Sequence, residues 1–210
     1  MPSSAAATIE LAAPQHCVPH IYVIPLVPSV SGGLLPDFDV HGNLPPRDLF
    51  PAGAPQQRRG AAVLLASLAE MRARYVDSYP KSASRPKIWD GWMEHRKALD
   101  ALGIKYATLV NGSFITDRLD PGDVDLCCMV DAADVNGLPS AGQTAYRALF
   151  DVAQCKKKYL CDPYAVTVYP LTHFRFQTMI NSITYWSNVF GVDRRGRPKS
   201  FVIVTEGGTP

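Results

Sequence analysis

The chain has 210 residues, long enough to bury a hydrophobic core within one domain. Hydrophobic residues make up 47% of it and charged residues 19%, an ordinary composition for a globular protein. The formal net charge of +2 excludes a strong overall field for polyanions, so any attraction to phosphate groups has to come from local basic clusters.

Cysteine usage and the length of the apolar runs predict a reduced, cytoplasmic setting. The number of cysteines is odd, and no CxxC or Cys/His pair has metal-ligand spacing. The five are Cys17, Cys127, Cys128, Cys155 and Cys161. The N-terminus lacks a basic segment followed by an unbroken apolar run, which argues against a signal peptide. No run approaches the ~18 apolar residues of a membrane span, so we expect no membrane association.

Proline divides the chain into two regions. More than half of the 18 prolines lie between Pro2 and Pro55, where they prevent long helices and remove donors for strand pairing. We therefore interpret residues 1–57 as a proline-rich N-terminal arm and residues 58–210 as the folded domain. Within the arm, only residues 21–26 have the composition of a short strand.

Helical periodicity begins after residue 60. One apolar stripe predicts a helix that ends near Tyr79, and a second predicts a helix over 88–102 that ends before Gly103. The apolar positions are Ala61, Leu64, Leu65, Leu68, Met71 and Tyr75, then Ile88, Trp92, His95, Leu99 and Leu102. On such a stripe, His95 is expected to be a structural histidine at the edge of the core. The tryptophans are expected to be core or interface anchors.

Strand and helix signals follow in alternation. The expected strands cover 106–110, 124–130, 159–169 and 201–205, and the expected helices cover 143–153 and 174–190. This order predicts an α+β domain (mixed α/β) in which a mixed β-sheet is packed by helices.

A glycine-serine turn follows the first of these strands. Glycine lets the backbone approach a phosphate group closely, and the N–H groups after it can cradle a triphosphate. The hydroxyl of Ser113 could add a hydrogen bond, and Thr116 is a second hydroxyl in the same turn. We therefore predict that Gly112, Ser113 and Thr116 bind a nucleotide.

Two aspartates open the next strand. Asp123 and Asp125 are separated by one residue, so on a strand both side chains leave the same face. Two carboxylates this close repel each other unless a cation neutralises them, and their hard oxygen atoms suit Mg²⁺ (or Mn²⁺). Such a pair can bridge two ions about 4 Å apart, which clamp the attacking and leaving oxygens of a phosphoryl transfer.

The combined pattern resembles the signature of the nucleotidyltransferase superfamily, which has a DNA polymerase β-like fold. That signature is an apolar strand, Gly-Ser, a gap of roughly ten residues and Asp-apolar-Asp-apolar. The resemblance implies a minimal nucleotidyltransferase core and a third carboxylate from a later strand, which completes the metal site and helps to deprotonate the acceptor hydroxyl. Asp162 matches this position best, and Asp151 is a weaker alternative because it falls on an expected helix.

A narrower resemblance covers residues 36–205. Residues 38–46 read FDVHGNLPP, and residues 190–199 read FGVDRRGRPK. These stretches are similar to the opening and ending of a small bacterial and phage family of unknown function with a nucleotidyltransferase-like core. Ser200 stands where that ending usually has glycine. The turn-forming residues of the opening predict a fixed loop in which His41 is structural.

Two basic runs allow a plainer interpretation than phosphate binding. Residues 194–199 contain Arg194, Arg195, Arg197 and Lys199, which could contact a triphosphate or an RNA backbone but more simply form a solvated hairpin. Residues 156–158 are three lysines, most simply an exposed turn before a strand.

Taken together, the sequence predicts a Mg²⁺-dependent enzyme that transfers an NMP from an NTP, such as ATP, to a hydroxyl acceptor. The acceptor is left open between an RNA such as tRNA, a protein, another nucleotide and a small molecule. The resemblance also makes a toxin–antitoxin or phage-defence role plausible. The alternative is a non-catalytic binding module with the same fold, an antitoxin or assembly subunit that holds a partner protein.

Overall fold

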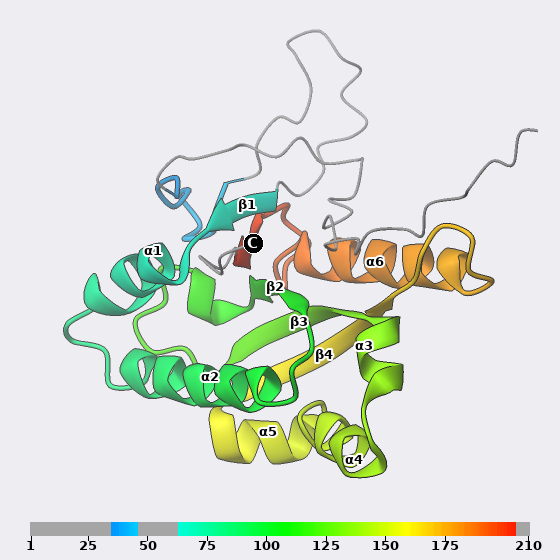
Figure 1. Cartoon of the computed structure of the whole chain (residues 1–210). Coiled ribbons are helices and arrows are strands. Elements are labelled where there is room, and N and C mark those ends of the chain that lie inside the picture. Colours follow the sequence, from blue (N-terminus) through cyan, green and yellow to red (C-terminus); the bar gives the residue numbers. More distant parts are fainter. Residues whose placement is uncertain (1–34, 46–62, 205–210) are drawn as a thin grey trace, which may run out of the picture.

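The computed structural model describes residues 35–45 and 63–204. A five-stranded mixed sheet forms its centre, with strand order β1-β5-β2-β3-β4 (Figure 1). The strands are β1 (Val63–Ala66), β2 (Tyr106–Asn111), β3 (Val124–Asp131), β4 (Cys161–Val168) and β5 (Phe201–Val204). The pairs β1–β5 and β3–β4 are parallel, and β2 is antiparallel to both of its neighbours. The mixed α+β fold class predicted from the sequence is confirmed.

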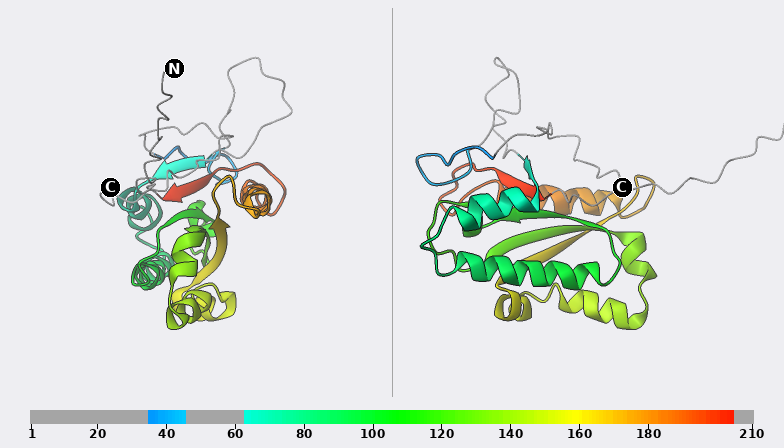
Figure 2. Two further views of the ribbon diagram at one scale, coloured as in Figure 1. Left: turned by 45° about the vertical axis from the view of Figure 1, so that its right-hand side comes forward. Right: turned by 60° about the vertical axis from the view of Figure 1, so that its left-hand side comes forward.

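Helices cover the two faces of the sheet. The α-helices are α1 (Leu68–Arg72), α2 (Arg85–Asp100), α3 (Ala132–Gly137), α4 (Ser140–Ala148), α5 (Val152–Tyr159) and α6 (Phe176–Phe190). A π-helical turn η2 (Ala73–Asp77) continues α1, and a 3-10 turn η3 (Ser113–Ile115) follows β2. Figure 2 (left) shows α1 and α2 on one side of the sheet and α6 on the other. Within the described ranges, no helix has both the length and the apolar character to span a bilayer.

The strands predicted after residue 103 are confirmed to within two residues at each end, as is the helix α6. The helix α2 is also present, but it begins three residues earlier than predicted, at Arg85. The apolar face of α2 is buried as expected: Ile88, Trp92 and Leu99 are fully covered. His95 is also fully buried, and its Nε2 lies 2.8 Å from the Leu149 carbonyl oxygen, so its structural role is confirmed. The predicted strand at 21–26 lies outside the described residues.

The helix predicted from residue 60 onward begins too early. Residues 63–66 form strand β1, which pairs with β5, and α1 starts only after Ser67. Ser67 and Glu70 form a capping box, in which each side chain accepts a hydrogen bond from the other residue's backbone N–H. A short apolar run fits a strand and a helix equally well, so pairing with a distant strand decided between them.

The predicted helix over 143–153 is in fact two helices. Asp151 ends the turn after α4 and caps α5, because its Oδ1 accepts the backbone N–H of Gln154 at 3.1 Å. The three lysines at 156–158 therefore lie on α5, and their assignment to a turn was wrong. The short helix α3, capped by Asp131, was not predicted.

The loop formed by residues 35–45 packs onto the domain. Asp39 Oδ1 accepts the backbone N–H groups of His41 and Asn43, which fixes the turn as the sequence predicted. Leu44 is 1% exposed and belongs to the core, and its carbonyl accepts the backbone N–H of Ser200. This part of the proline-rich region is thus built into the folded body.

Candidate active site

Three aspartates gather where β3 and β4 begin. The parallel register places Asp125 opposite Asp162, and the antiparallel register places Asn111, at the end of β2, on the other side of Asp125. Register partners point to the same face of a sheet, so these side chains share one face. Asp123 directly precedes β3 and lies close enough to raise the pKa of Asp125.

The glycine-serine turn lies against these acids. A Cβ atom built on Gly112 would fall 1.8 Å from Asp125 Oδ2, and Gly112 has a φ of +82° and a ψ of −165°. Both features require glycine, because only a residue without a side chain permits this conformation and this approach. Gly112 therefore brings the backbone of the turn into contact with Asp125.

The two hydroxyls of the turn have different surroundings. Thr116 Oγ1 donates to the Ser113 carbonyl oxygen at 2.8 Å, so it stabilises the 3-10 turn η3. The Ser113 side chain is half-buried, and its hydroxyl makes no hydrogen bond to the part of the chain that is described. Of the two, Ser113 is the hydroxyl still available for a ligand.

A buried arginine holds the loop between the turn and the aspartates. Arg85, on α2, is 0% exposed and its guanidinium donates to five backbone carbonyl oxygens at 2.5–3.2 Å. The acceptors are Tyr75, Phe114, Thr116, Arg118 and Leu119. The guanidinium also stacks on the Tyr79 ring at 3.9 Å from its centroid. Sequence reasoning missed this residue, because an arginine at the start of a helix ordinarily faces solvent.

Burial and crowding shift the protonation of Asp125. Burial raises the pKa of its carboxyl to about 6, and the charges of Asp123 and Asp162 add to the shift. Lys199 and Lys156 act in the opposite direction. The site thus holds more negative charge than its own lysines compensate.

Lys156 bridges two of the three acids. Its Nζ lies 2.8 Å from Asp162 Oδ2 and 3.1 Å from Asp123 Oδ2. The hydrogen bond to Asp162, followed by that to Asp123, raises the pKa of Lys156 above its ordinary value. Sequence reasoning missed this contact, although the position of Lys156 in the last helical turn before β4 is a signal that could have suggested it.

The donor atoms suit a divalent cation, but a lysine already engages them. Asp162 Oδ1 is buried and has no hydrogen-bond partner within the described ranges, and carboxylate oxygens are the ligands that Mg²⁺ and Mn²⁺ prefer. Across residues 35–45 and 63–204, however, no three His, Cys, Asp or Glu side chains are arranged to hold a metal ion. The residues fit in chemistry, and a metal ion would compete with Lys156 for the same oxygens.

The second basic run forms a hairpin, and one residue of it turns inward. Val192 and Pro198 pair across the hairpin, and Asp193 Oδ1 accepts the backbone N–H groups of Arg195 and Arg197. The predicted hairpin is confirmed. Lys199 differs from the solvated prediction, since it is only 6% exposed.

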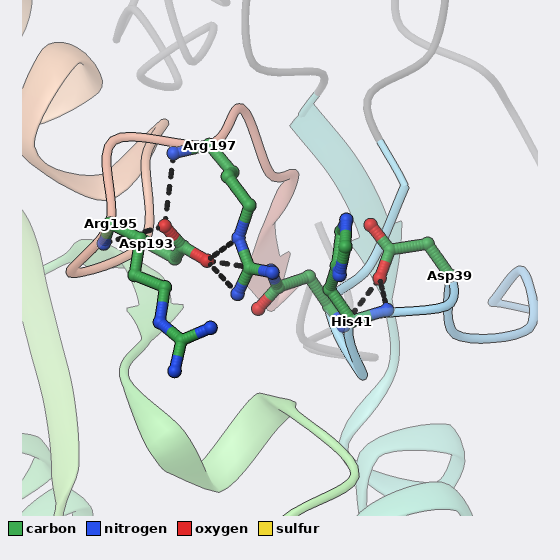
Figure 3. A network of polar contacts seen from close by, with 6 residues as sticks. Asp39, His41, Asp193, Arg195 and Arg197 are labelled. Atoms are coloured by element: carbon green, nitrogen blue, oxygen red, sulfur yellow. Dashed lines mark hydrogen bonds and ion pairs between the residues drawn. The ribbon is translucent and has the colours of Figure 1, made fainter.

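The opening loop and this hairpin meet in space. Figure 3 shows Asp39 and His41 beside Asp193, Arg195 and Arg197. The contact is direct, because Asn43 Nδ2 donates to Asp193 Oδ2 at 3.2 Å. The loop of residues 35–45 also contacts the segment after the glycine-serine turn, because a Cβ atom built on Gly42 would lie 1.9 Å from Asp117 Oδ1. Two stretches 150 residues apart in sequence thereby enclose the same end of the sheet.

Aromatic side chains lie beside Asp162. Tyr164, two residues along β4, packs on Trp186 of α6 with ring centroids 4.2 Å apart. Burial and the neighbouring Asp162 raise the pKa of the Tyr164 hydroxyl to about 12, so it stays protonated as a hydrogen-bond donor.

Two other tryptophans lie in the core, away from Asp162. The rings of Trp89 and Trp92 pack against each other with centroids 5.3 Å apart, as predicted for anchor residues.

Comparison with known proteins gives one match. Residues 36–205 match a family of unknown function, DUF6932. No curated protein and no solved structure matches the chain. Because the match covers well over half of the 210 residues, the chain belongs to the DUF6932 family.

Proposed function

We propose that this protein is a nucleotidyltransferase that moves an NMP from an NTP to a hydroxyl acceptor in the presence of Mg²⁺ or Mn²⁺. One observation supports the proposal above all others. Asp125 stands opposite Asp162 in the sheet and against Gly112 of the glycine-serine turn. Acids for a cation and a backbone cradle for phosphates are thus side by side.

Asp123, Asp125 and Asp162 would hold the divalent cation. When bound, such an ion neutralises the charge of the phosphates and of the oxygens that enter and leave. The repulsion that Asp123 and Asp162 exert on Asp125, and the unpartnered Oδ1 of Asp162, both favour a cation at this place.

The other roles fall to the chain itself. The backbone at Gly112 and the Ser113 hydroxyl would bind the β- and γ-phosphates and orient the α-phosphorus. An acceptor oxygen forms a bond to that phosphorus while the bond to the oxygen bridging to the β-phosphate breaks. Pyrophosphate leaves, and the proton of the acceptor hydroxyl passes to the Asp162 carboxylate. Such a transfer depends on position and charge, so it needs few other residues.

A second candidate function follows from Lys156. Its ammonium joins Asp123 and Asp162, which compensates two of the acids without any metal ion. A protein that keeps this arrangement permanently would be a non-catalytic binding module, such as an antitoxin or an assembly subunit that holds a partner protein.

Calorimetric titration with Mg²⁺ and each NTP separates the two functions. The enzyme predicts metal-dependent nucleotide binding that Asp125→Asn removes, with Asp90→Asn as the control because Asp90 is exposed on α2. Absence of binding by the wild type, or equal binding by Asp125→Asn, would remove the catalytic function. Incubation with each α-labelled NTP and cell extract then shows whether RNA, protein or a small molecule becomes labelled.

A further inference from the structure

Lys199 is a buried lysine without a contacting acid. It is 6% exposed, and within the described part of the chain its ammonium makes no hydrogen bond and no ion pair within 4.0 Å. Burial lowers its pKa, while the more distant charges of Asp125 and Asp193 partly restore it. The side chain as a whole is covered, yet its Nζ is not among the buried polar atoms that lack a partner, so the ammonium keeps an accessible surface on which a ligand can bind.

The backbone around Lys199 is held at the same end of the sheet as the glycine-serine turn. Lys199 donates its backbone N–H to the Gly191 carbonyl at 2.9 Å. The carbonyl of the preceding Phe190 accepts a hydrogen bond from Asn111 Nδ2 at 3.0 Å, and Asn111 directly precedes Gly112. These contacts connect the base of the hairpin to the end of β2.

The rest of the hairpin adds positive charge to this end. Asp193 pairs with Arg197, whose Nε lies 2.6 Å from its Oδ2, so this carboxylate is already engaged within the hairpin. The guanidinium of Arg195 points away from Asp193 in Figure 3 and has no ion pair with any described residue. Arg194 is near enough to lower the pKa of Lys199. The hairpin thus carries Lys199 and two exposed arginines, Arg194 and Arg195, none of which has an ion pair with a described residue.

We propose that Lys199 binds the terminal phosphates of an oligophosphate chain, with Arg194 and Arg195 of the hairpin at the rim. The ligand's identity as a nucleoside triphosphate rests on the proposed function. The oligophosphate chemistry follows from a lysine without an ion pair among the described residues, held at the end of β2 that leads into Gly112 and within the electrostatic reach of Asp125. Lys199 would act as a binding residue: it fixes the leaving phosphates while the aspartates act at the α-phosphorus.

The test uses inorganic tripolyphosphate, titrated into the full chain in the presence of Mg²⁺. Wild type should bind it, and Lys199→Met should weaken the affinity by about tenfold or more, since a charge-assisted hydrogen bond is lost. Lys199→Arg should retain more affinity than Lys199→Met. Lys105→Met is the matched control and should leave the affinity unchanged, because Lys105 is exposed at the opposite end of β2.

Thermal unfolding distinguishes a binding role from a structural one. Burial disfavours the charge of Lys199, and methionine covers the same surface with a side chain of similar length. The unfolding temperature of Lys199→Met should therefore equal or exceed that of wild type. A lower unfolding temperature with unchanged tripolyphosphate affinity would overturn the proposal. So would a wild type that does not bind tripolyphosphate.

Failure of the proposed function gives a different result. If tripolyphosphate binding depends on Lys199 but no NTP labels any acceptor, nucleotidyl transfer is wrong and the oligophosphate site remains. If labelling occurs and Lys199→Met has the wild-type KM for the NTP, the transfer remains and the role of Lys199 is wrong.

Discussion

Two basic segments of this protein look alike in sequence and behave differently in the fold. Residues 156–158 and residues 194–199 were both expected to be solvated, yet each sends one lysine toward the aspartates. Lys156 contacts Asp123 and Asp162 directly, whereas Lys199 is buried near Asp125 with no ion pair among the described residues. The comparison separates a lysine that is paired with two aspartates from a lysine that has no ion pair among the described residues.

The largest effect is expected at Arg85, because Arg85 fixes the loop that leads to Asp123, one of the aspartates that Lys156 contacts. Arg85→Met should lower the free energy of unfolding by about 3–5 kcal/mol, because it leaves five backbone carbonyls without their donor. Urea unfolding measures the change. Lys87→Met, an exposed change on the same helix, should have little effect. Equal stability of the two variants would mean that the loop holds itself in place.

The next largest effect is expected at Gly112, which lets the glycine-serine turn lie directly against Asp125. Gly112→Ala should destabilise the fold by about 3 kcal/mol, from backbone strain and the clash with the carboxylate. Tripolyphosphate binding should be lost as well. Gly137→Ala is the control, since nothing lies within 4 Å of a Cβ there. A Gly112→Ala variant with wild-type stability would show that the turn and Asp125 are not in contact.

Lys156→Met tests the counter-ion half of the comparison. Without metal the variant should lose about 1 kcal/mol, a modest value because the Lys156 side chain is 46% exposed. Its affinity for Mn²⁺ should rise, by about tenfold if the lysine and the ion compete for the same oxygens. Electron paramagnetic resonance of free Mn²⁺ measures this, with Lys157→Met on the same helix as the control. Unchanged or weaker Mn²⁺ binding would contradict the competition.

The smallest expected effect is the contribution of His95 to the pH dependence of stability. Burial lowers the pKa of His95 in the fold, so the unfolded chain takes up a proton that the folded chain refuses. The stability that His95 contributes is therefore complete above its unfolded pKa, near 6.5, and falls as the pH drops below it. His95→Gln should flatten the pH dependence of urea unfolding between about pH 7 and pH 5. An unaltered profile would assign that dependence to other groups.

Much of the architecture was readable from local patterns. The strand before Gly112 and the strand after Asp123 are short, apolar and bounded by turn residues, and the structure has both. The periodicity of apolar residues also predicts the helices α2 and α6. The errors occurred where a pattern was ambiguous, as for β1, or where one capping residue divides a helical run, as Asp151 does.

The sequence by itself determined which residues could carry the chemistry: a glycine-serine turn and acids at Asp123, Asp125 and Asp162. Their spacing along the chain is local, and local spacing fixes strand faces and turns. Only the tertiary structure decided what surrounds them. Lys199 and Arg85 reach the site from distant segments, and Lys156 reaches it from a helix that had been read as a turn. Such contacts depend on which strands become neighbours and where their register stops, and no short window of sequence contains that information.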